Sequence, residues 1–517
     1  MFSTVLSASL QGMQAEFIHV EADVGNGLPF FHMVGHLASE VKESAERVRT
    51  AVKNSGIQIP PRKVVINLSP ANVRKRGAAF DLPIAAAVLA ANGVISQETL
   101  VNVLIIGELS LDGGVEKVPG ILPILLEAKE HGCVRCMIPK ENEQEGRSIT
   151  GMEVIGVSKL TELIEVAKKI EQEGEKIVWK NHKVSGERNI EVEDRCQGSE
   201  DFSEIKGQTF VKRAAEIAVA GEHNLLLIGP PGSGKTMVAR RIPTIFPPLS
   251  MEECIEISKV YSVAGFLDEK RPLILARPFR AVHHTVTKAA LVGGGLHPVP
   301  GELSLSHGGC LFLDEAAEFR KDVLEVLREP LEEQKIHIVR NGGSYLFPAD
   351  TIVVAAMNPC PCGQFPDYNR CRCSEQEIRN YLGRISGPLL DRIDLCVDVP
   401  KVRYESLIQT DEEETSDIIR ARVCAAREIQ KKRYEGQKKQ TNGRVSVKTL
   451  MEHCELDPEG KEKMKRSFET LQLTARSYYK VLRVARTIAD LEGSEKIEST
   501  HLDEALIYRT MDQKYWR

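Results

Sequence analysis

The segment LLLIGPPGSGKTMVARRI, residues 225–242, constrains the fold of this 517-residue chain more than any other stretch. An apolar run typical of a buried strand leads into a glycine-rich loop ending in Lys235 and Thr236, and a helical pattern follows. In such a unit backbone N–H groups surround nucleotide phosphates, the lysine adds charge, and the threonine hydroxyl ligates Mg²⁺. A bare glycine-rich turn would lack the flanking strand and helix, so we expect an ATP site. The expected contacts are Gly229, Pro230, Pro231, Gly232, Ser233, Gly234, Lys235, Thr236 and Met237.

Polar side chains also end two further apolar runs. The run CLFLDE ends in Asp314 and Glu315, and the run TIVVAAMNP contains Asn358. We expect Asp314 to hold Mg²⁺ and Glu315 to polarise the attacking water, which would make hydrolysis the outcome of binding. Asn358 would orient the same water or contact the γ-phosphate. Each residue taken singly is also compatible with a helix start or a turn.

The arrangement of patterns predicts a multidomain α/β protein. Short buried strands alternate with helices between residues 200 and 400, which is typical of a parallel sheet flanked by helices. We expect a mixed α/β domain at 1–166, a charged linker at 167–199, and a helical region at 401–517. Its clearest helix, SYYKVLRVARTIADLEG, would place four apolar residues on one side, namely Leu482, Ala485, Ile488 and Ala489.

Composition leaves the partner open. The chain has 68 Lys and Arg against 73 Asp and Glu, so no global field attracts it to nucleic acid. The longest apolar stretch, LPIAAAVLAA, is too short to cross a bilayer, and the N-terminus lacks a signal-peptide pattern. We therefore expect a cytoplasmic protein with no membrane partner.

Two local basic runs are candidates for phosphate contact. NVRKRGAAF and AAREIQKKRYEGQKKQTNGR are equally compatible with solvated surfaces, and Tyr434 in the second run could stack on a base. The basic residues concerned are Arg74, Lys75 and Arg76 in the first run, and the densest group of the second, Lys431, Lys432, Arg433, Lys438 and Lys439.

Four of the twelve cysteines lie in one short segment rich in turn formers. They form two CxC pairs eight residues apart, Cys360 with Cys362 and Cys371 with Cys373. Disulfides are not expected in a reducing compartment, so zinc bound by four thiolates is the favoured interpretation. Free thiols or a redox switch remain alternatives. The separate pair Cys133 and Cys136 has no second pair nearby and is expected to be core.

The order of these motifs resembles that of AAA+ ATPases. GPPGSGKT resembles Walker A, CLFLDE resembles Walker B, and IKGQTFVKRAAEIAVAGEHN is similar to the segment lining the adenine pocket. The resemblance implies that Asn358 is sensor 1, Arg392 an arginine finger with Arg384 as second choice, and Arg476 sensor 2 on the lid. It also implies a ring, with ATP at subunit interfaces.

A narrower resemblance, to the magnesium-chelatase-like YifB/ComM family, covers nearly the whole chain. It lies in RPFRAVHHTVTKAALVGGGLHPVPGELSLSHGGCLFLDE and in the cysteine segment with RISGPLLDRIDL. Residues 277–307 are similar to a helix-2 insert, although a flexible surface loop is the plain alternative. The family includes a hexameric branch-migration helicase, so the resemblance implies a motor acting on single-stranded or branched DNA.

The first domain resembles the Lon-protease-like, S5-type fold. GAAFDLPIAAAVLA and the stretch from GELSLDGG to MIPKEN are similar to the segments that carry serine and lysine in Lon. This chain has Leu82 and Leu122 at the matching positions, so we expect no proteolysis. Two other functions remain open from the sequence. One is a metal-chelatase motor subunit, and the other is a protein-remodelling chaperone or scaffold.

Overall fold

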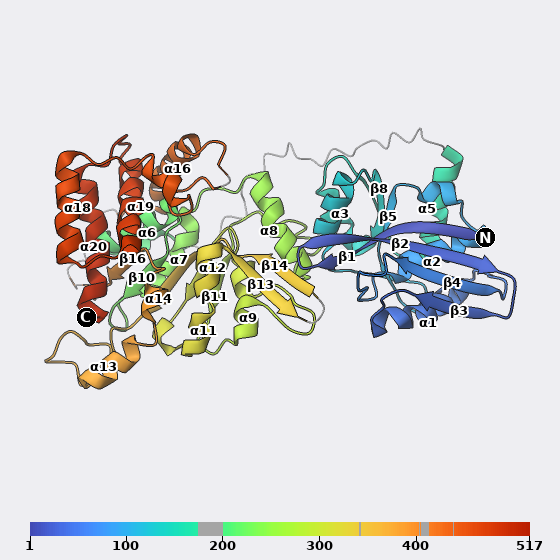
Figure 1. Cartoon of the computed structure of the whole chain (residues 1–517), viewed down its shortest axis with the longest axis horizontal. Coiled ribbons are helices and arrows are strands. Elements are labelled where there is room, and N and C mark those ends of the chain that lie inside the picture. The colour runs from blue at the N-terminus through green and yellow to red at the C-terminus, as the bar shows by residue number, and fades with distance from the viewer. Residues whose placement is uncertain (174–199, 341–342, 403, 405–412, 438, 517) are drawn as a thin grey trace. The chain divides into compact units, whose positions relative to one another are not determined.

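The computed structural model describes residues 1–173, 200–340, 343–402, 404, 413–437 and 439–516 (Figure 1). The chain groups into two compact units. The first comprises residues 1–193, 251–274 and 337–347, and the second comprises 194–250, 275–336 and 348–517. Both units contain a sheet with helices, which confirms the predicted multidomain α/β class.

The first unit is built on a seven-stranded sheet of order β3-β4-β2-β1-β5-β8-β9. Its strands are β1 (Phe2–Gln11), β2 (Gln14–Gly25), β3 (Phe30–Val34), β4 (Lys63–Ser69), β5 (Val103–Ile105), β8 (Arg135–Pro139) and β9 (Glu153–Val157). A small sheet pairs β6 (Glu108–Leu109) with β7 (Val115–Glu116). The helices are α1 (Ser39–Asn54), α2 (Asp81–Ala91), α3 (Ile121–Glu130), α4 (Glu143–Arg147), α5 (Leu160–Glu173) and α8 (Met251–Val263).

Two apolar clusters cover the opposite faces of this sheet. Val103 and Ile105 of β5 belong to one cluster and Leu104 to the other, because successive side chains of a strand point to opposite sides. Every residue of α2 is buried, since it packs against β1, β2 and α1. Cys133 and Cys136 are buried in the second cluster, which confirms that they are core residues.

Two later segments of the chain are folded into the first unit. Helix α8 packs against α3, where Ser262 hydrogen-bonds to the Glu145 carboxylate and accepts the backbone N–H of Leu122 at 3.2 Å. The hairpin of β13 (Lys335–Arg340) and β14 (Gly343–Pro348) contributes Tyr345, whose hydroxyl accepts from Arg76 at 2.8 Å. The expected core range 200–400 is thus interrupted twice.

The expected linker begins later than residue 167. Helix α5 continues to Glu173, so the first residues of that range are helical. The remainder, 174–199, lies outside the described residues.

The second unit contains a five-stranded, fully parallel sheet of order β11-β12-β15-β10-β16, as the alternating patterns predicted. Its strands are β10 (Leu225–Ile228), β11 (Phe279–Val282), β12 (Cys310–Leu313), β15 (Ile352–Met357) and β16 (Leu395–Asp398). The helices between residues 200 and 400 of this unit are α6 (Thr209–Gly221), α7 (Lys235–Arg241), α9 (Lys288–Val292), α10 (Glu302–Leu305), α11 (Lys321–Glu325), α12 (Arg328–Glu333), α13 (Glu375–Leu382) and α14 (Gly387–Leu390). The C-terminal helices are α16 (Ser416–Arg433), α17 (Val447–Met451), α18 (Pro458–Thr470), α19 (Ala475–Leu491) and α20 (Ser499–Trp516).

One apolar core joins the sheet of the second unit to its C-terminal helices. Val354 of β15 and Leu395 of β16 belong to the same buried cluster as Leu482 and Ile488 of α19. Helix α6 mediates this packing because it contacts both α16 and α19. The apolar face predicted for α19 is buried as expected.

Strand β11 corrects one prediction. Residues 279–282 lie inside the range expected to be an insert, 277–307, but they form the edge strand of the parallel sheet. Any insert therefore begins after Val282. In the described part of the chain, no helix combines the length and apolarity that crossing a membrane requires.

Candidate nucleotide site

The site lies at the carboxyl edge of the parallel sheet in the second unit. Strands β12, β15 and β10 are neighbours, so the residues that follow them share this edge. The glycine loop follows β10 and precedes α7, Asp314 follows β12, and Asn358 follows β15. Topology thus brings together three segments that are far apart in the sequence.

The glycine loop depends on conformations that other residues rarely adopt. Gly232 and Gly234 have φ angles of +75° and +90°, in the left-handed region. A Cβ at Gly229 would lie 2.2 Å from the carbonyl oxygen of Val399, so no side chain fits there. These glycines let the backbone curve tightly enough to present its N–H groups to an anion.

Lys235 connects two of the three segments. Its amino group donates to the carbonyl oxygens of Gly229 at 2.7 Å and Pro230 at 2.9 Å, and to Oδ1 of Asn358 at 3.2 Å. Burial lowers the pKa of Lys235 to about 8, although Asp314 and Glu315 favour the charged form. Phosphate oxygens would favour that form further.

Thr236 and Asp314 form the oxygen pair that suits Mg²⁺. The Thr236 hydroxyl donates to Oδ2 of Asp314 at 3.1 Å. A hydroxyl and a carboxylate at this distance match the hard oxygen ligands that Mg²⁺ prefers beside nucleotide phosphates. The donor set thus fits ATP with Mg²⁺.

Glu315 has an unusual backbone and a partner that the sequence analysis missed. Its φ is +53°, and its side chain is 59% exposed. One carboxylate oxygen lies 3.4 Å from Nδ1 of His284. His284 follows β11 by two residues, at the same edge of the sheet. The motif AVHHT after a strand was the signal that could have identified it.

Arg392 and Arg476 meet at a single carboxylate, that of Glu332. Arg392 pairs with Glu332 and donates through Nε to the carbonyl oxygen of Arg328 at 2.6 Å, and Arg476 lies 3.1 Å from Glu332. Within the described chain neither arginine bonds to Lys235, Thr236, Asp314 or Asn358. The two arginines therefore form a second cluster, and no local pattern pointed to Glu332.

Helix α19 links this arginine cluster to the sheet. Lys480, one turn after Arg476, donates to the carbonyl oxygen of Ile393 at 2.9 Å and pairs with Asp394 at 3.2 Å. Burial lowers the pKa of Lys480 to about 8, against the effect of Asp394. These contacts fix the position of helix α19, and with it Arg476, relative to the segment that follows Arg392.

Arg384 has different contacts. It donates to the carbonyl oxygen of Ala317 at 2.7 Å and to Glu318 at 2.8 Å, just beyond Glu315. Its side chain is 43% exposed. The structure therefore holds Arg384 against the Walker B segment of its own chain.

The segment expected to line the adenine pocket reaches the glycine loop. Gln208, at the start of α6, donates to the carbonyl oxygens of Ser233 at 2.8 Å and Pro400 at 3.2 Å. Its φ of +53° is again left-handed. The adenine contact itself stays a prediction.

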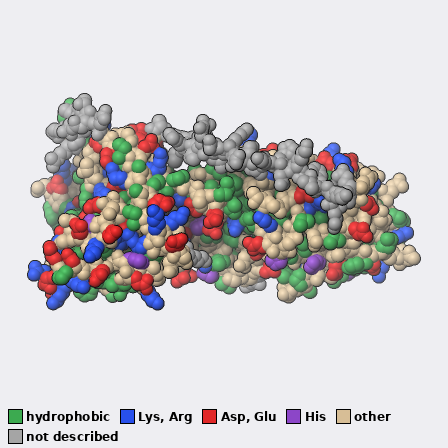
Figure 2. Space-filling model, turned by 90° about the horizontal axis from the view of Figure 1, so that it is seen from above, with side chains coloured by type: hydrophobic (Ala, Val, Ile, Leu, Met, Phe, Trp, Pro, Cys, Tyr) green, Lys and Arg blue, Asp and Glu red, His purple; other side chains and the backbone are tan. Residues whose placement is uncertain are grey.

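Phosphate contact was one of two open interpretations of the basic runs, and the structure leaves few of their residues accessible. Lys75 is fully buried with its amino group bonded to the carbonyl of Pro70, and Arg76 is held by Tyr345. In the first unit only Arg74 of the three is exposed. Figure 2 shows basic and acidic side chains interspersed on the face that it presents.

The second run is mostly engaged in packing as well. Arg433 donates to Asp490 at 2.8 Å, and Lys439 pairs with Asp350. Tyr434 is 1% exposed and its hydroxyl donates to Asn442, so the expectation of base stacking is wrong. Two of these residues, Lys431 and Lys432, are exposed, and Lys438 lies outside the described residues.

The first unit has no dyad at the Lon-like positions. Leu82 and Leu122 are both fully buried, and they belong to different apolar clusters. Neither side chain carries a hydroxyl or an amine, so these positions provide no nucleophile or base.

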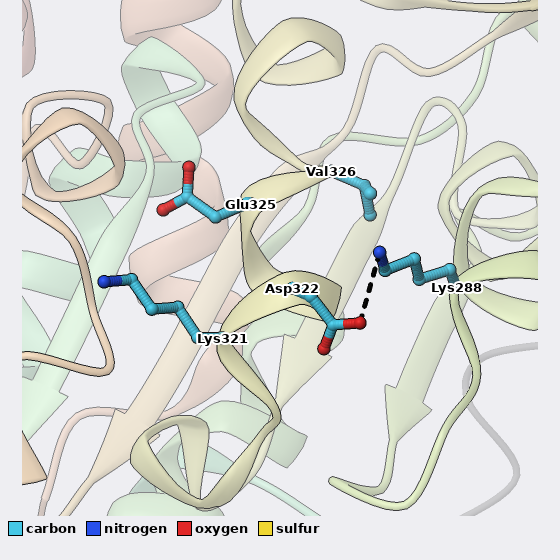
Figure 3. A pocket seen from close by; sticks show the side chains of 5 residues that line it. All are labelled: Lys288, Lys321, Asp322, Glu325 and Val326. Atoms are coloured by element: carbon cyan, nitrogen blue, oxygen red, sulfur yellow. Dashed lines mark ion pairs between the residues drawn. The ribbon is translucent and has the colours of Figure 1, made fainter.

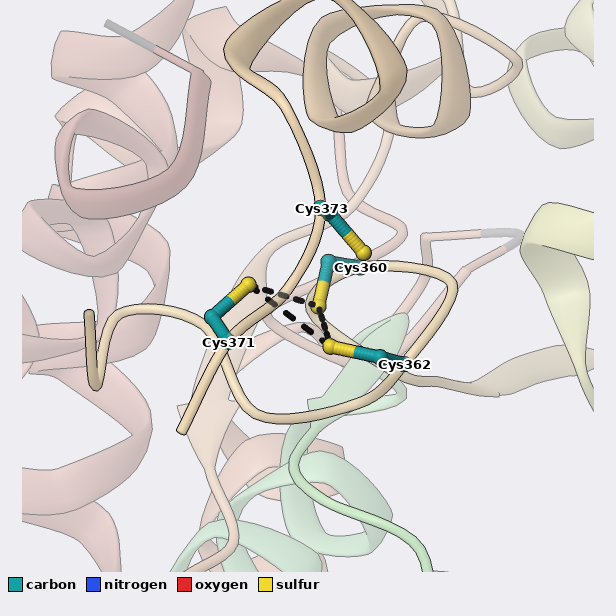
Figure 4. A group of neighbouring side chains, drawn as sticks. All are labelled: Cys360, Cys362, Cys371 and Cys373. Atoms are coloured by element: carbon teal, nitrogen blue, oxygen red, sulfur yellow. Dashed lines mark hydrogen bonds between the residues drawn. The ribbon is translucent and has the colours of Figure 1, made fainter. Parts of the chain in front are cut away.

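The four clustered cysteines converge on one point in the second unit (Figure 4). Their sulfur atoms all lie within 4.8 Å of one another. Three separations are 3.4 Å for Cys360–Cys362, 3.6 Å for Cys362–Cys371 and 3.8 Å for Cys360–Cys371. Sulfurs of a tetrahedral zinc site, each about 2.3 Å from the metal, lie about 3.8 Å apart.

A hollow between α9 and α11 is separate from these groups. It has a volume of about 490 Å³ and is lined by Lys288, Lys321, Asp322, Glu325 and Val326 (Figure 3). Lys288 pairs with Asp322 at 3.1 Å, and the hydrogen bond between them holds the pKa of Asp322 below its usual range. The hollow shares no lining residue with the phosphate site.

The matches to known proteins cover nearly the entire chain. Models of the magnesium chelatase subunit ChlI match residues 20–142 and 201–407, and a model of its C-terminal region matches 413–509. Competence protein ComM of Haemophilus influenzae is 38% identical over 515 residues, covering 98% of this chain and 97% of the relative. The uncharacterised protein YifB of Escherichia coli is 38% identical over 512 residues, covering 99% and 97%. Lon protease 2 of Bacillus subtilis is 30% identical over 128 residues, 25% of this chain and 23% of the protease.

The P-loop on a parallel sheet, the helical C-terminal region and these matches define a protein of the AAA+ class. More narrowly, the chain belongs to the YifB/ComM family of magnesium-chelatase-like proteins.

Proposed function

We propose that this chain hydrolyses ATP in a ring of identical copies, each site being cradled by one copy and completed by arginines of the next. The observation that carries this proposal is the meeting of Arg392 and Arg476 at Glu332, without a bond to the phosphate-site residues of their own chain. Arginines placed in this way can serve a neighbour's γ-phosphate, as arginines supplied in trans do. Head-to-tail contacts of this kind generate a ring when the rotation between neighbouring copies closes, and a closed ring is the assembly that we propose.

The residues divide the chemistry among them. Lys235 and the loop N–H groups bind the β- and γ-phosphates, while Thr236 and Asp314 hold Mg²⁺. Glu315 turns from His284 toward the attacking water and polarises it, and Asn358 orients that water. When bound, Mg²⁺ neutralises charge on the phosphates.

Arg392 is the proposed arginine finger. The alternative, Arg384, is anchored to Ala317 and Glu318 beside the Walker B segment of its own chain. Arg476, the residue that the resemblance assigns to sensor 2 on the lid, is proposed to act beside Arg392, since both contact Glu332 and Lys480 of helix α19 bonds to Ile393.

We propose DNA as the substrate on which this motor acts, by branch migration or strand displacement in a hexamer. The family membership and the name of the Haemophilus relative, a competence protein, support this assignment. Within the described residues of the two basic runs, the exposed cations are Lys431, Lys432 and Arg74. Branched DNA is the substrate class to test first.

A chelatase motor subunit is the second candidate, favoured by the three matches to ChlI. Such a subunit would share the ATP site and drive metal insertion through a partner protein. DNA would leave its turnover unchanged.

The test is ATP turnover with and without single-stranded, duplex and Holliday-junction DNA, with Lys235→Ala as the inactive control. Stimulation by junction DNA, together with movement of the branch, supports the DNA assignment. Turnover that no DNA changes contradicts it and favours the chelatase candidate. No turnover above the Lys235→Ala background contradicts hydrolysis itself.

We further propose that the four-cysteine cluster holds a structural Zn²⁺. The sulfur separations match a closed tetrahedral site, and each ligand is a thiolate of the type that selects zinc. Metal analysis of the purified chain is expected to give one zinc per chain. A metal-free chain with four freely titrating thiols contradicts the assignment.

A further inference from the structure

The segment that carries the four cysteines, residues 360–373, lies against the phosphate-binding loop. Gly363 has φ +75°, and a Cβ placed on it would lie 2.3 Å from Cδ and 3.2 Å from Cγ of Pro231. Pro231 is in the middle of the glycine loop. The backbone of the cysteine segment therefore packs directly on the loop that would surround the phosphates.

The same segment is joined to a second element of the site. Cys360 is fully buried and follows Asn358 by two residues. Its carbonyl oxygen accepts the N–H of Gly363 at 2.9 Å, and its sulfur accepts the N–H of Phe365 at 3.4 Å. The turn that presses Gly363 on Pro231 is thus built around a cysteine next to Asn358.

A second series of contacts connects the cysteine segment to the start of the glycine loop, at Gly229. The ring of Phe365 lies 6.2 Å from that of Tyr515 on α20, and the Tyr515 hydroxyl donates to Asp398 at 2.7 Å. Asp398 ends β16 and precedes Val399, whose carbonyl oxygen lies against Gly229. The loop is held at Gly229 and at Pro231.

The cysteine segment has little apolar packing of its own to maintain this arrangement. Cys360 and Gly363 are its only buried residues, and the stretch from Pro366 to Arg370 is exposed. A loop with so little core is ordered chiefly by what crosslinks it. Four thiolates on one ion would supply that crosslink.

We infer that the four-cysteine centre is a clamp on the phosphate-binding loop, so that the presence of its metal sets the affinity of the chain for ATP. The inference rests on the ATP and zinc sites proposed above. It assigns the metal a role in nucleotide binding and not only in folding. Loss of the ion frees Gly363 from Pro231, and the loop must then be ordered by ATP at a cost in affinity.

The first test removes the ion from the full-length chain. A variant combining Cys360→Ser, Cys362→Ser, Cys371→Ser and Cys373→Ser is compared with Cys424→Ser, which changes a half-buried cysteine on α16. Zinc content and the Kd for a fluorescent ATP analogue with Mg²⁺ are measured. The fourfold variant is expected to lose zinc and bind about tenfold more weakly, a change of about 1.4 kcal/mol. Zinc loss with an unchanged Kd overturns the clamp.

The second test breaks the contact and leaves the sulfurs in place. Gly363→Ala puts a methyl group into Pro231, whereas Gly436→Ala, at φ +79°, has nothing within 4 Å of its added Cβ. Both changes strain the backbone alike, so their difference isolates the contact. We expect Gly363→Ala to keep one zinc and to raise the Kd severalfold above that of Gly436→Ala. Equal Kd values overturn the clamp, and this test holds even if the fourfold variant does not fold.

These readouts are independent of hydrolysis and of DNA. A chain that binds ATP with the expected differences but shows no turnover contradicts the proposed function and leaves the clamp standing. If ATP turnover is normal and neither the fourfold cysteine variant nor Gly363→Ala changes the Kd for the ATP analogue, the clamp is contradicted and the proposed function is not.

Discussion

Leu82 and Leu122 occupy the Lon-like positions of the first unit, whereas Lys235, Asp314 and Glu315 stand at the sheet edge of the second. In the first unit those side chains lie in apolar clusters and contribute to packing. In the second unit the polar groups are kept half-buried or exposed, at the expense of packing. The difference teaches that Leu82 and Leu122 serve packing at positions where a buried polar group without a partner would cost stability, whereas the sheet edge of the second unit leaves its polar groups accessible for chemistry.

The largest expected effect concerns the arginine cluster of the second unit. Arg392→Ala should lower ATP turnover about 10³-fold with ATP binding kept, since an arginine finger acts mainly on the transition state. Arg466→Ala, which removes an arginine 77% exposed in its ion pair, is the control. Turnover assays on purified variants measure the effect.

Mixing variants decides whether Arg392 acts on a neighbour. Copies with Arg392→Ala keep their phosphate loops, and copies with Lys235→Ala keep their arginines, so a mixed ring contains some complete interfaces. Partial recovery of turnover on mixing is the expected result. No recovery would show that Arg392 serves its own chain.

Glu315→Gln should reduce turnover about a hundredfold or more while ATP still binds, because the amide cannot polarise water as a carboxylate does. Rapid-quench measurement of ATP cleavage and a binding titration separate the two effects. Glu375→Gln, at an exposed carboxylate on α13, is the matched change. If Glu315→Gln cleaves ATP as fast as the wild type, Glu315 does not polarise the attacking water, and the proposed functional difference between the two units is contradicted.

The packing role of Leu122 in the first unit can be tested by introducing a charge. Leu122→Lys places a charge where the structure has a fully buried apolar side chain, and should lower the free energy of unfolding by about 3 kcal/mol. Leu111→Lys, at a leucine 55% exposed, should change it little. Chemical unfolding of the full chain measures both.

Combining Leu82→Ser with Leu122→Lys should still give no peptidase activity, since the two positions belong to separate clusters. Cleavage of a casein substrate by this double variant would mean that the first unit retains a site.

The smallest effect is a pH dependence of ATP binding. The pKa of Lys235 is about 8 without phosphates, which would raise it. Below pH 8 the amine is charged in both states, so affinity is constant. Above pH 8 binding takes up a proton, and affinity falls by up to about tenfold per pH unit.

Calorimetric titration between pH 7 and 9.5 measures this dependence. Lys235→Arg is the control, because its guanidinium stays charged over the whole range. A wild-type affinity that is flat to pH 9.5 would contradict a lowered pKa at Lys235.

Local patterns were enough to predict the glycine loop and three strands of the second unit, β10, β12 and β15, because apolar runs bounded by turn residues are read from neighbours in the sequence. Local patterns did not predict β11 or β16. Local patterns failed where folding decides whether a side chain is buried or accessible. The sequence allowed a phosphate contact by Lys75 and base stacking by Tyr434, but in the structure the two side chains are buried and donate hydrogen bonds to Pro70 and Asn442.

The same reason explains what was missed in the site. The order of the motifs predicted different roles for Arg392, an arginine finger, and Arg476, sensor 2. In the structure both arginines form ion pairs with Glu332, which lies in a charged helix with no distinguishing motif. His284 was within reach of sequence reasoning, since it follows a strand at the edge where Asp314 and Glu315 emerge. Glu332 was not, because nothing in its surroundings distinguishes it from other surface carboxylates.

Helix α8 and the 337–347 hairpin have a practical consequence for dissecting this protein. The backbone passes from one unit to the other five times, at 193/194, 250/251, 274/275, 336/337 and 347/348. No single cut releases either unit as an uninterrupted piece, and a fragment starting at residue 200 would carry α8 without the α3 surface on which it packs. Truncation would therefore produce two damaged halves, and the contribution of each unit has to be separated by single-residue changes within the intact polypeptide.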